Sequence, residues 1–169
     1  MKKTKILYLH GLDSHLTDEK RKILENHFEV VAPQINYREN ITLFQELSEI
    51  LTTNKDIEAV IGSSMGGCFS YYLSLYHTLP GLLFNPALVY TSIEINLPKL
   101  IDNSNALTFI IGGKDTVVPA MENRVWIESI NTNTNYILKW YNQLEHRIDL
   151  DTFKTEVDAF ALLVSKQSK

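Results

Sequence analysis

Ser64 stands at the centre of a Gly-x-Ser-x-Gly pattern, with Gly62 and Gly66 two residues away on either side. In this pattern the serine occupies a sharp turn between a buried strand and a helix, and the glycines leave room for backbone that a Cβ would obstruct. A serine hydroxyl on such a turn acts as a nucleophile when a neighbouring base, usually a histidine, removes its proton. The spacing selects Ser64 over Ser63, because Ser63 has no glycine at these two positions.

Two other interpretations of this segment stay open at this point. Small residues also suit the packing of a tight strand-to-helix turn that has no chemistry, and glycines before a helix N-terminus suit a phosphate-binding loop. The order Gly-x-x-x-Gly-Gly nevertheless differs from the Gly-x-Gly-x-x-Gly of dinucleotide-binding loops, and no Gly-Lys-Ser/Thr follows it. The nucleophile hypothesis therefore requires a base and an acid elsewhere in the chain.

The segments on either side of Ser64 match the strand and the helix that such a turn needs. Ile57–Ile61 is short, mostly apolar and rich in β-branched residues, which is typical of a buried parallel strand. Cys68–His77 repeats large apolar residues at helical spacing. Further strands are predicted at Lys5–His10, Glu29–Gln34, Gly81–Phe84, Ala106–Ile111 and Asn135–Trp140, and further helices at Thr17–His27, Ile41–Thr53, Pro119–Ile130 and Leu150–Val164.

Six strands that alternate with helices predict an α/β fold in three layers. A mainly parallel, doubly wound sheet would form the middle layer, covered by helices on both faces. Sheets of this kind bind ligands at the carboxyl ends of their strands, so polar residues that directly follow strands are the candidates for chemistry. They are His10-Gly11, Ser64, Asn85, Asp115 and His146.

Of the five histidines, His146 has the position that a base for the nucleophile requires. It lies between the last strand and the last helix, at the edge of the sheet where the serine is expected. His10 and His15 belong to the loop after the first strand. His27 and His77 fall near helix ends and are expected at the solvated surface or as charge partners of helix C-termini. A loop histidine without a catalytic role is the alternative interpretation of His146.

Asp115 is the candidate acid, which would orient His146 and stabilise its imidazolium. It follows the strand Ala106–Ile111 through a Gly-Gly-Lys turn. An ordinary turn or helix-capping aspartate is the alternative, because aspartates are common after glycines.

The rival acids fit this role less well. Asp102 precedes its strand and so lies at the wrong end of the sheet. Asp149 and Asp151 are expected to begin the last helix, where carboxylates favour the positive end of the dipole. With Asp115 as the acid, the chain order of nucleophile, acid and base is the one expected for a serine on a strand-to-helix elbow.

Two backbone N–H groups are candidates for an oxyanion hole. Met65 directly follows the nucleophile and would supply an N–H at a helix N-terminus. The second donor is expected from the loop after the first strand, where Gly11 lets the backbone turn and Leu12 would present its N–H.

The 169 residues are expected to form one domain, residues 1–169, of ordinary globular composition. A net charge of −4 argues against a general nucleic-acid binder. The apolar run Ile6–Leu9 after the N-terminal lysines is too short for a signal peptide, and no apolar run has the length of a membrane span. One cysteine excludes an internal disulfide, so we expect a cytoplasmic protein.

Four motifs together resemble those of an α/β-hydrolase: His10-Gly11-Leu12, the elbow Gly62-Ser63-Ser64-Met65-Gly66-Gly67, Gly112-Gly113-Lys114-Asp115 and Glu145-His146. The short chain, the Gly-Ser-Ser-x-Gly-Gly elbow and Phe84-Asn85-Pro86-Ala87 are most similar to the small YqiA-like bacterial esterases. The match extends from Ile6 to about Phe160, nearly the whole chain.

This resemblance implies roles for the residues at the matching positions. Ser64 would be the nucleophile, Asp115 the acid and His146 the base, with Leu12 and Met65 as oxyanion donors. Asn85-Pro86 looks like the strand-end motif of the family and is expected to shape the pocket floor, although a simple strand terminator is the alternative.

The connection between the two strands that follow the nucleophile helix is short. Many α/β-hydrolases insert a lid there, but Ala87–Asn105 leaves space for no more than a short helix or loop, so a lid is expected to be minimal or absent. An open site favours small or short-chain acyl substrates over interfacial lipase activity. Cys68 is expected to be a buried small hydrophobe. Apolar candidates for the pocket lining, each equally able to be core, are Leu12, Leu88, Val89, Tyr90, Val117 and Val118, beside the polar strand-end positions His10, Gly11 and Asn85.

The sequence thus predicts an esterase or thioesterase that works through a Ser-His-Asp triad and an acyl-enzyme. No metal or organic cofactor is implied, since the His and carboxylate spacings match no metal motif. The expected partner is a small-molecule acyl substrate, with neither nucleic acid nor membrane, and the oligomeric state is left open. The alternatives are a catalytically inactive hydrolase fold that serves as a binding module, and an acyltransferase or perhydrolase that uses the same triad.

Overall fold

A six-stranded sheet forms the middle layer of the computed structural model, which describes residues 3–89, 91–99, 106–130 and 135–167. The strands follow the order β2-β1-β3-β4-β5-β6, and each neighbouring pair is parallel. Their bounds are Thr4–Leu9 for β1, Phe28–Val31 for β2, Ile57–Ser63 for β3, Gly81–Phe84 for β4, Leu107–Gly112 for β5 and Tyr136–Tyr141 for β6. The predicted parallel sheet is confirmed.

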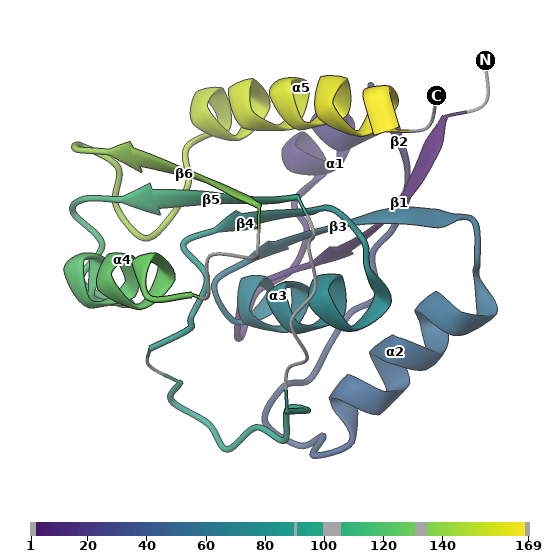
Figure 1. The fold of residues 1–169 in the computed structure, drawn as a ribbon, viewed down its shortest axis with the longest axis horizontal. Coiled ribbons are helices and arrows are strands. Elements are labelled where there is room, and N and C mark those ends of the chain that lie inside the picture. Colours follow the sequence, from purple (N-terminus) through teal and green to yellow (C-terminus); the bar gives the residue numbers. More distant parts are fainter. Residues whose placement is uncertain (1–2, 90, 100–105, 131–134, 168–169) are drawn as a thin grey trace.

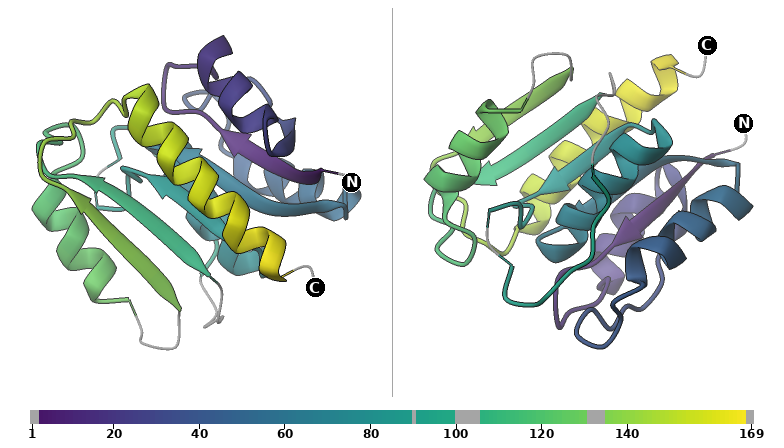
Figure 2. Two further views of the ribbon diagram at one scale, coloured as in Figure 1. Left: turned by 90° about the horizontal axis from the view of Figure 1, so that it is seen from above. Right: turned by 60° about the horizontal axis from the view of Figure 1, so that its bottom comes forward.

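Helices cover both faces of the sheet. On one face lie α1 (Asp18–Glu25) and α5 (Leu150–Gln167), and on the other lie α2 (Leu43–Thr53), α3 (Met65–His77) and α4 (Ala120–Glu128) (Figure 1). Seen from above, α5 runs obliquely across the strands with α1 beside it (Figure 2). The predicted three-layer α/β/α architecture is therefore confirmed.

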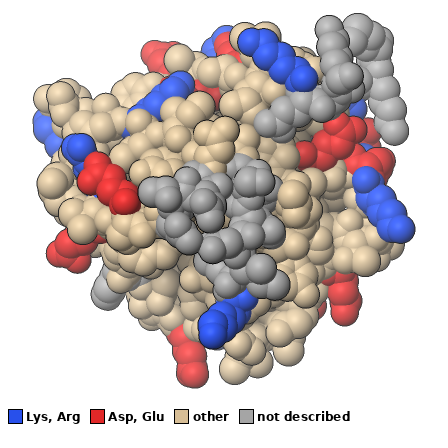
Figure 3. All heavy atoms as spheres, viewed as in Figure 1, with Lys and Arg blue, Asp and Glu red and all other residues tan. Residues whose placement is uncertain are grey.

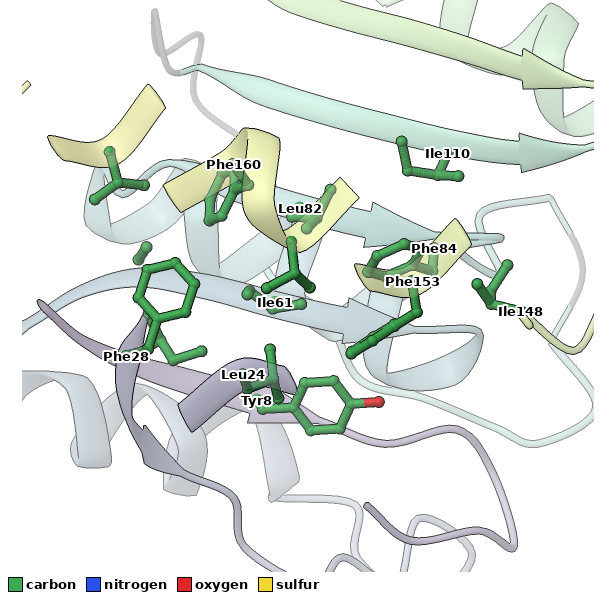
Figure 4. Close-up of a cluster of buried hydrophobic side chains, with 14 of the residues drawn as sticks. Tyr8, Leu24, Phe28, Ile61, Leu82, Phe84, Ile110, Ile148, Phe153 and Phe160 are labelled. Carbon is green, nitrogen blue, oxygen red and sulfur yellow. The ribbon is translucent and has the colours of Figure 1, made fainter. Parts of the chain in front are cut away.

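Alternate residues of the central strands enter separate cores on the two faces of the sheet. In β1, Ile6 and Tyr8 pack toward α1 and α5, whereas Leu7 and Leu9 pack toward α2 and α3. Figure 4 shows the first of these cores, where Phe153 of α5 stacks on Phe84 of β4 with ring centroids 5.0 Å apart. Because both faces of the sheet are buried, its strands read in the sequence as nearly continuous apolar runs.

The chain reverses its winding direction between β1 and β3. From β1 it moves outward to β2, and it then crosses back to place β3 on the other side of β1. Leu9 and Gly62 are paired near the ends of these two strands, so the segments that begin at His10 and at Ser64 leave the sheet side by side. Crevices at such switch points are where open α/β sheets bind ligands.

Two predicted boundaries differ from the observed ones for identifiable reasons. The strand predicted at Glu29–Gln34 ends at Val31, because the chain then turns beneath the end of β1, where the N–H of Ile35 donates to His10. The helix predicted from Cys68 already begins at Met65. Its first turn contains two glycines, which are poor helix formers, but a Cβ on Gly66 would collide with the carbonyl oxygen of Leu9.

The surface carries charges of both signs. On the face in Figure 3, acidic and basic side chains are interspersed around the edge. Among the helices of the described residues, none combines the length and the apolar character needed to cross a membrane.

Candidate active site

Ser64 lies on a strained turn between β3 and α3. Its backbone has φ 54° and ψ −117°, a combination that L residues rarely adopt. Its N–H donates to the carbonyl of Phe84 at 2.9 Å, and its own carbonyl accepts from the N–H groups of Cys68 and Ala87, each at 3.0 Å. The end of β4 and the first turn of α3 thus hold the backbone of Ser64, and its side chain remains partly exposed.

The structure brings Ser64, His146 and Asp115 together, as predicted. His146 Nε2 lies 3.0 Å from Ser64 Oγ, and His146 Nδ1 lies 2.7 Å from Asp115 Oδ2. The His146 side chain is 25% exposed, whereas that of Asp115 is 2% exposed. An ionised carboxylate accepts hydrogen bonds and donates none, so Nδ1 carries the proton and the Nε2 lone pair faces the serine hydroxyl.

The carboxylate of Asp115 is fixed by backbone donors of its own turn. Its Oδ1 accepts from the N–H groups of Val117 and Val118, both at 2.9 Å, which leaves Oδ2 for the imidazole. The rival acids lie elsewhere. Asp149 caps α5 by accepting from the N–H of Thr152 at 2.8 Å, and Asp151 lies in the first turn of α5. Asp102 lies outside the described residues.

The loop that carries His146 packs directly on the end of β5. A Cβ on Gly112 would lie 2.5 Å from the carbonyl oxygen of Leu144, so a glycine is required for this close approach. The N–H of Lys114 donates to the same carbonyl at 3.0 Å. These backbone contacts set the height of the loop above the sheet.

Asn85, at the end of β4, is buried beneath this loop. Its side chain donates to the carbonyl oxygens of Glu145 and His146 and accepts from the N–H of Gly112. Asn85 was predicted at this edge of the sheet, and the family resemblance implied that it shapes the pocket floor. The structure adds a contact with the backbone of the predicted base, which strand-end position alone does not reveal.

His10 is buried, and both of its ring nitrogens make hydrogen bonds. Its Nε2 accepts from the N–H of Ile35 at 2.9 Å, so Nδ1 carries the proton and donates to the carbonyl of Gly11 at 2.7 Å. Its own carbonyl accepts from the hydroxyl of Tyr37 at 2.6 Å. His10 was predicted as a polar position in the pocket lining. With an exposed fraction of 2%, it supports the first loop instead of presenting a polar group to an open pocket.

The first loop passes close to Ser64. A Cβ on Gly11 would lie 3.4 Å from Ser64 Cβ, and Leu12, the predicted oxyanion donor, comes next and is half-buried. Asp13 follows in the left-handed region with φ 53°, and its carboxylate pairs with Arg38, the Nη2 to Oδ2 distance being 2.6 Å. The loop therefore has a defined shape on both sides of Leu12.

Met65, the other predicted oxyanion donor, is the first residue of α3. The N–H groups of a helix's first turn have no intrahelical partner, and the positive end of the helix dipole lies there. The peptide N–H that directly follows Ser64 is thus in a position where negative charge is favoured.

Comparisons with known proteins agree with this architecture. The model of a family described as "Uncharacterised protein family (UPF0227)" matches residues 5–108, more than half of the chain. The chain belongs to the UPF0227 family. The resemblance to the small YqiA-like hydrolases, stated from the sequence motifs, is thereby confirmed.

Several solved structures share the fold of this UPF0227 chain. A putative hydrolase of the α/β superfamily from Xanthomonas campestris is 18% identical, with a TM-score of 0.73 over 98% of this chain and 99% of that chain. SOBER1 from Arabidopsis thaliana is 14% identical, with a TM-score of 0.73 over 99% and 100%. Est1E from Butyrivibrio proteoclasticus is 12% identical, with a TM-score of 0.73 over 98% and 89%. At these identities the likeness establishes the fold.

The apolar residues predicted to line a pocket in this UPF0227 protein differ in their exposure. Val117, two residues after Asp115, is 58% exposed, whereas Val118 belongs to a buried cluster with Cys68 and Ala87. Leu88 and Val89 pack against that cluster and are half-buried, and Tyr90 lies outside the described residues. Val118 is therefore part of the core, the alternative that the sequence left open.

Two further predictions concern Cys68 and the pair His27 and His77. Cys68 is buried as expected, and desolvation raises the pKa of its thiol to about 12, so the thiol is protonated at neutral pH. His27 and His77 were expected at the solvated surface or as charge partners of helix C-termini, and His77 does lie in the last turn of α3. Both are half-buried and hydrogen-bonded, His27 Nε2 to Asp158 at 2.7 Å and His77 Nε2 to Ser48 Oγ at 2.7 Å. Among the described residues, no three His, Cys, Asp or Glu side chains gather as metal ligands would.

Proposed function

We propose that this protein is a serine hydrolase of carboxylic esters or thioesters with small or short acyl groups. The observation that supports this function best is the continuous hydrogen-bonded relay from Asp115 through His146 to Ser64, with the serine on a strained elbow at the switch point of the sheet. Three strand ends far apart in sequence contribute to this arrangement. Such a relay is the general device by which a weakly nucleophilic hydroxyl is activated.

The proposed reaction proceeds in two halves. Ser64 Oγ forms a bond to the substrate carbonyl carbon while His146 Nε2 takes the hydroxyl proton, and the N–H groups of Leu12 and Met65 donate to the carbonyl oxygen as it becomes negative. The bond to the leaving oxygen or sulfur then breaks, and His146 returns its proton to the leaving group. In the second half His146 deprotonates water, which attacks the acyl carbon; the bond from that carbon to Ser64 Oγ then breaks, and His146 returns the proton to Oγ. Asp115 stabilises the imidazolium in both halves.

The segment after β4 supports a preference for small acyl groups. Residues 87–89 and 91–99, the described part of the connection to β5, contain neither helix nor strand, in line with the minimal lid expected from its length. Ser64 and His146 are both partly exposed, so a substrate reaches them without crossing a covering domain. A long acyl chain would gain little additional burial at so open a site.

A chain-length series tests this proposal. We expect the wild-type protein to hydrolyse p-nitrophenyl acetate and butyrate, with kcat/KM flat or falling toward the decanoate, and acetyl and butyryl thioesters measured in parallel would show which leaving group is preferred. A kcat/KM that rises steadily with chain length would contradict the preference for short acyl groups. Failure to hydrolyse any member, in a folded sample, would favour a binding module.

Acyl transfer to an acceptor other than water is the remaining alternative, because the same relay permits it. Product analysis with hydrogen peroxide or an alcohol present distinguishes the two. We expect free acid as the main product, and predominance of the peracid or the new ester would indicate a perhydrolase or a transferase.

A further inference from the structure

Asn85 has a backbone conformation that its sequence position disfavours. Its φ is 40°, in the left-handed region, and the next residue is Pro86, whose ring pushes a preceding residue toward extended conformations. A residue held in such a conformation marks a place where the surroundings over-determine the backbone. At 1% exposure, Asn85 is fixed by protein contacts rather than by solvent.

The side-chain amide of Asn85 is fully engaged, and its partners are all backbone groups. The Nδ2 group donates to the carbonyl of Glu145 at 2.9 Å and to that of His146 at 3.0 Å. The Oδ1 atom accepts from the N–H of Gly112 at 2.7 Å. One side chain therefore joins the ends of β4 and β5 to two consecutive residues of the loop that carries His146.

Backbone hydrogen bonds fix the other end of this arrangement. The N–H of Asn85 donates to the carbonyl of Ile110 in β5 at 2.8 Å, so the amide is held against the sheet. The His146 ring, by contrast, makes its described hydrogen bonds to Asp115 and Ser64 alone and is partly exposed. The imidazole depends on its own backbone for its height above the serine, and Asn85 contacts that backbone directly.

We propose that Asn85 is a positioning residue, which holds the backbone of His146 so that Nε2 stays within hydrogen-bond reach of Ser64 Oγ. This inference rests on the proposed function of the relay. Displacement of a reacting group by about 1 Å typically costs about a hundredfold in rate. A substitution that releases the loop therefore slows both proton transfers while substrate binding is unaffected.

Asn85→Asp is the sharpest test, because it keeps the shape and the acceptor for the Gly112 N–H while replacing the donor of two hydrogen bonds by an oxygen. Aspartate also tolerates the left-handed conformation. We expect kcat per folded molecule to fall about a hundredfold, with KM unchanged within about twofold. If the aspartate variant does not fold, Asn85→Gly serves instead, because glycine accepts φ 40° and lacks the side chain. It should likewise lower kcat and leave KM unchanged.

Asn123→Asp is the matched control. Asn123 is equally buried, at 1%, and its Nδ2 donates to the carbonyl of Pro86 at 2.9 Å, next to Asn85 but away from the loop that carries the base. This variant also loses a buried donor. We expect a lower melting temperature but a kcat per folded molecule within about twofold of wild type, since no contact to the His146 loop changes.

A double-mutant cycle separates positioning from general damage. In a His146→Ala background the residual rate comes from the oxyanion hole and binding, so Asn85→Asp should lower it no further. An equal loss in both backgrounds, or an unchanged kcat in folded Asn85→Asp, would overturn the positioning role. If the proposed function itself were wrong, the wild-type protein would hydrolyse no ester or His146→Ala alone would leave its activity unchanged, and both results are distinct from these.

Discussion

Replacing Ser64 by alanine should lower kcat for p-nitrophenyl acetate by about a million-fold, as loss of the nucleophile does in a comparable triad. Oγ is the atom that would bond to the acyl carbon, and its hydroxyl donates to His146 Nε2 at a distance of 3.0 Å. The backbone hydrogen bonds that Ser64 makes to the end of β4 and to α3 do not involve its side chain, so we expect the fold to be kept. Release of p-nitrophenolate, with circular dichroism as a check of folding, measures the effect.

Ser48→Ala provides a matched control for this loss. Ser48 Oγ lies 2.7 Å from His77 Nε2, closer than Ser64 Oγ lies to His146. Ser48 sits in the middle of α2, however, where the backbone N–H groups are committed to the helix and cannot form an oxyanion hole. We expect unchanged kcat. Comparable losses in the two variants, or retention of most activity in Ser64→Ala, would contradict the assignment of Ser64.

Asp115→Asn should lower kcat by about ten-thousand-fold, while the shape of the turn is kept. Asp115 Oδ1 accepts from the N–H groups of Val117 and Val118, so the amide oxygen of the new side chain is expected to take that place. The NH₂ group then faces His146 Nδ1, which must act as the acceptor. The proton moves to Nε2, and the imidazole can no longer take a proton from Ser64. Steady-state kinetics with p-nitrophenyl butyrate measures the effect.

Asp149→Asn is the control for Asp115→Asn. Asp149 follows the loop that carries His146 and caps α5 through Thr152, but it makes no described contact with the relay. Asparagine is as good a helix cap as aspartate, so both kcat and stability should stay near their wild-type values. A large loss of kcat in Asp149→Asn, or a small one in Asp115→Asn, would point to a different acid.

Much of the fold follows from patterns that are local in the sequence. The strands are predicted within three residues because both faces of the sheet are buried and each strand is a short apolar run, as in Gly81–Phe84, whose bounds match those of β4. The helix after Ser64 was predicted to start too late, because Gly66 and Gly67 argue against a helix locally. Packing against β1 overrides that preference, and this tertiary effect is absent from any single segment.

The candidate site divides in the same way. Ser64 was predicted from the glycines on either side of it. Asp115 and His146 were predicted from their positions after strands, since parallel strands bring their carboxyl ends to one edge. The contacts of Asn85 with residues 60 and 61 positions away depend on which loop lies over which strand, and no periodicity records that. His10 was predicted to line the pocket because it directly follows a strand. Its hydrogen bond to Ile35, 25 residues away, turns it into a support for the first loop.

Covalent labelling with a fluorophosphonate tests the central claim most directly, because the reagent bonds to a serine that is activated by a neighbouring base. The folded protein should gain one adduct per chain, and peptide mass spectrometry should place it on Ser64. The adduct should be absent in Ser64→Ala, unchanged in Ser48→Ala and formed far more slowly in His146→Ala. A folded protein that takes no label, or one labelled on a serine other than Ser64, would contradict the assignment of Ser64 as the nucleophile.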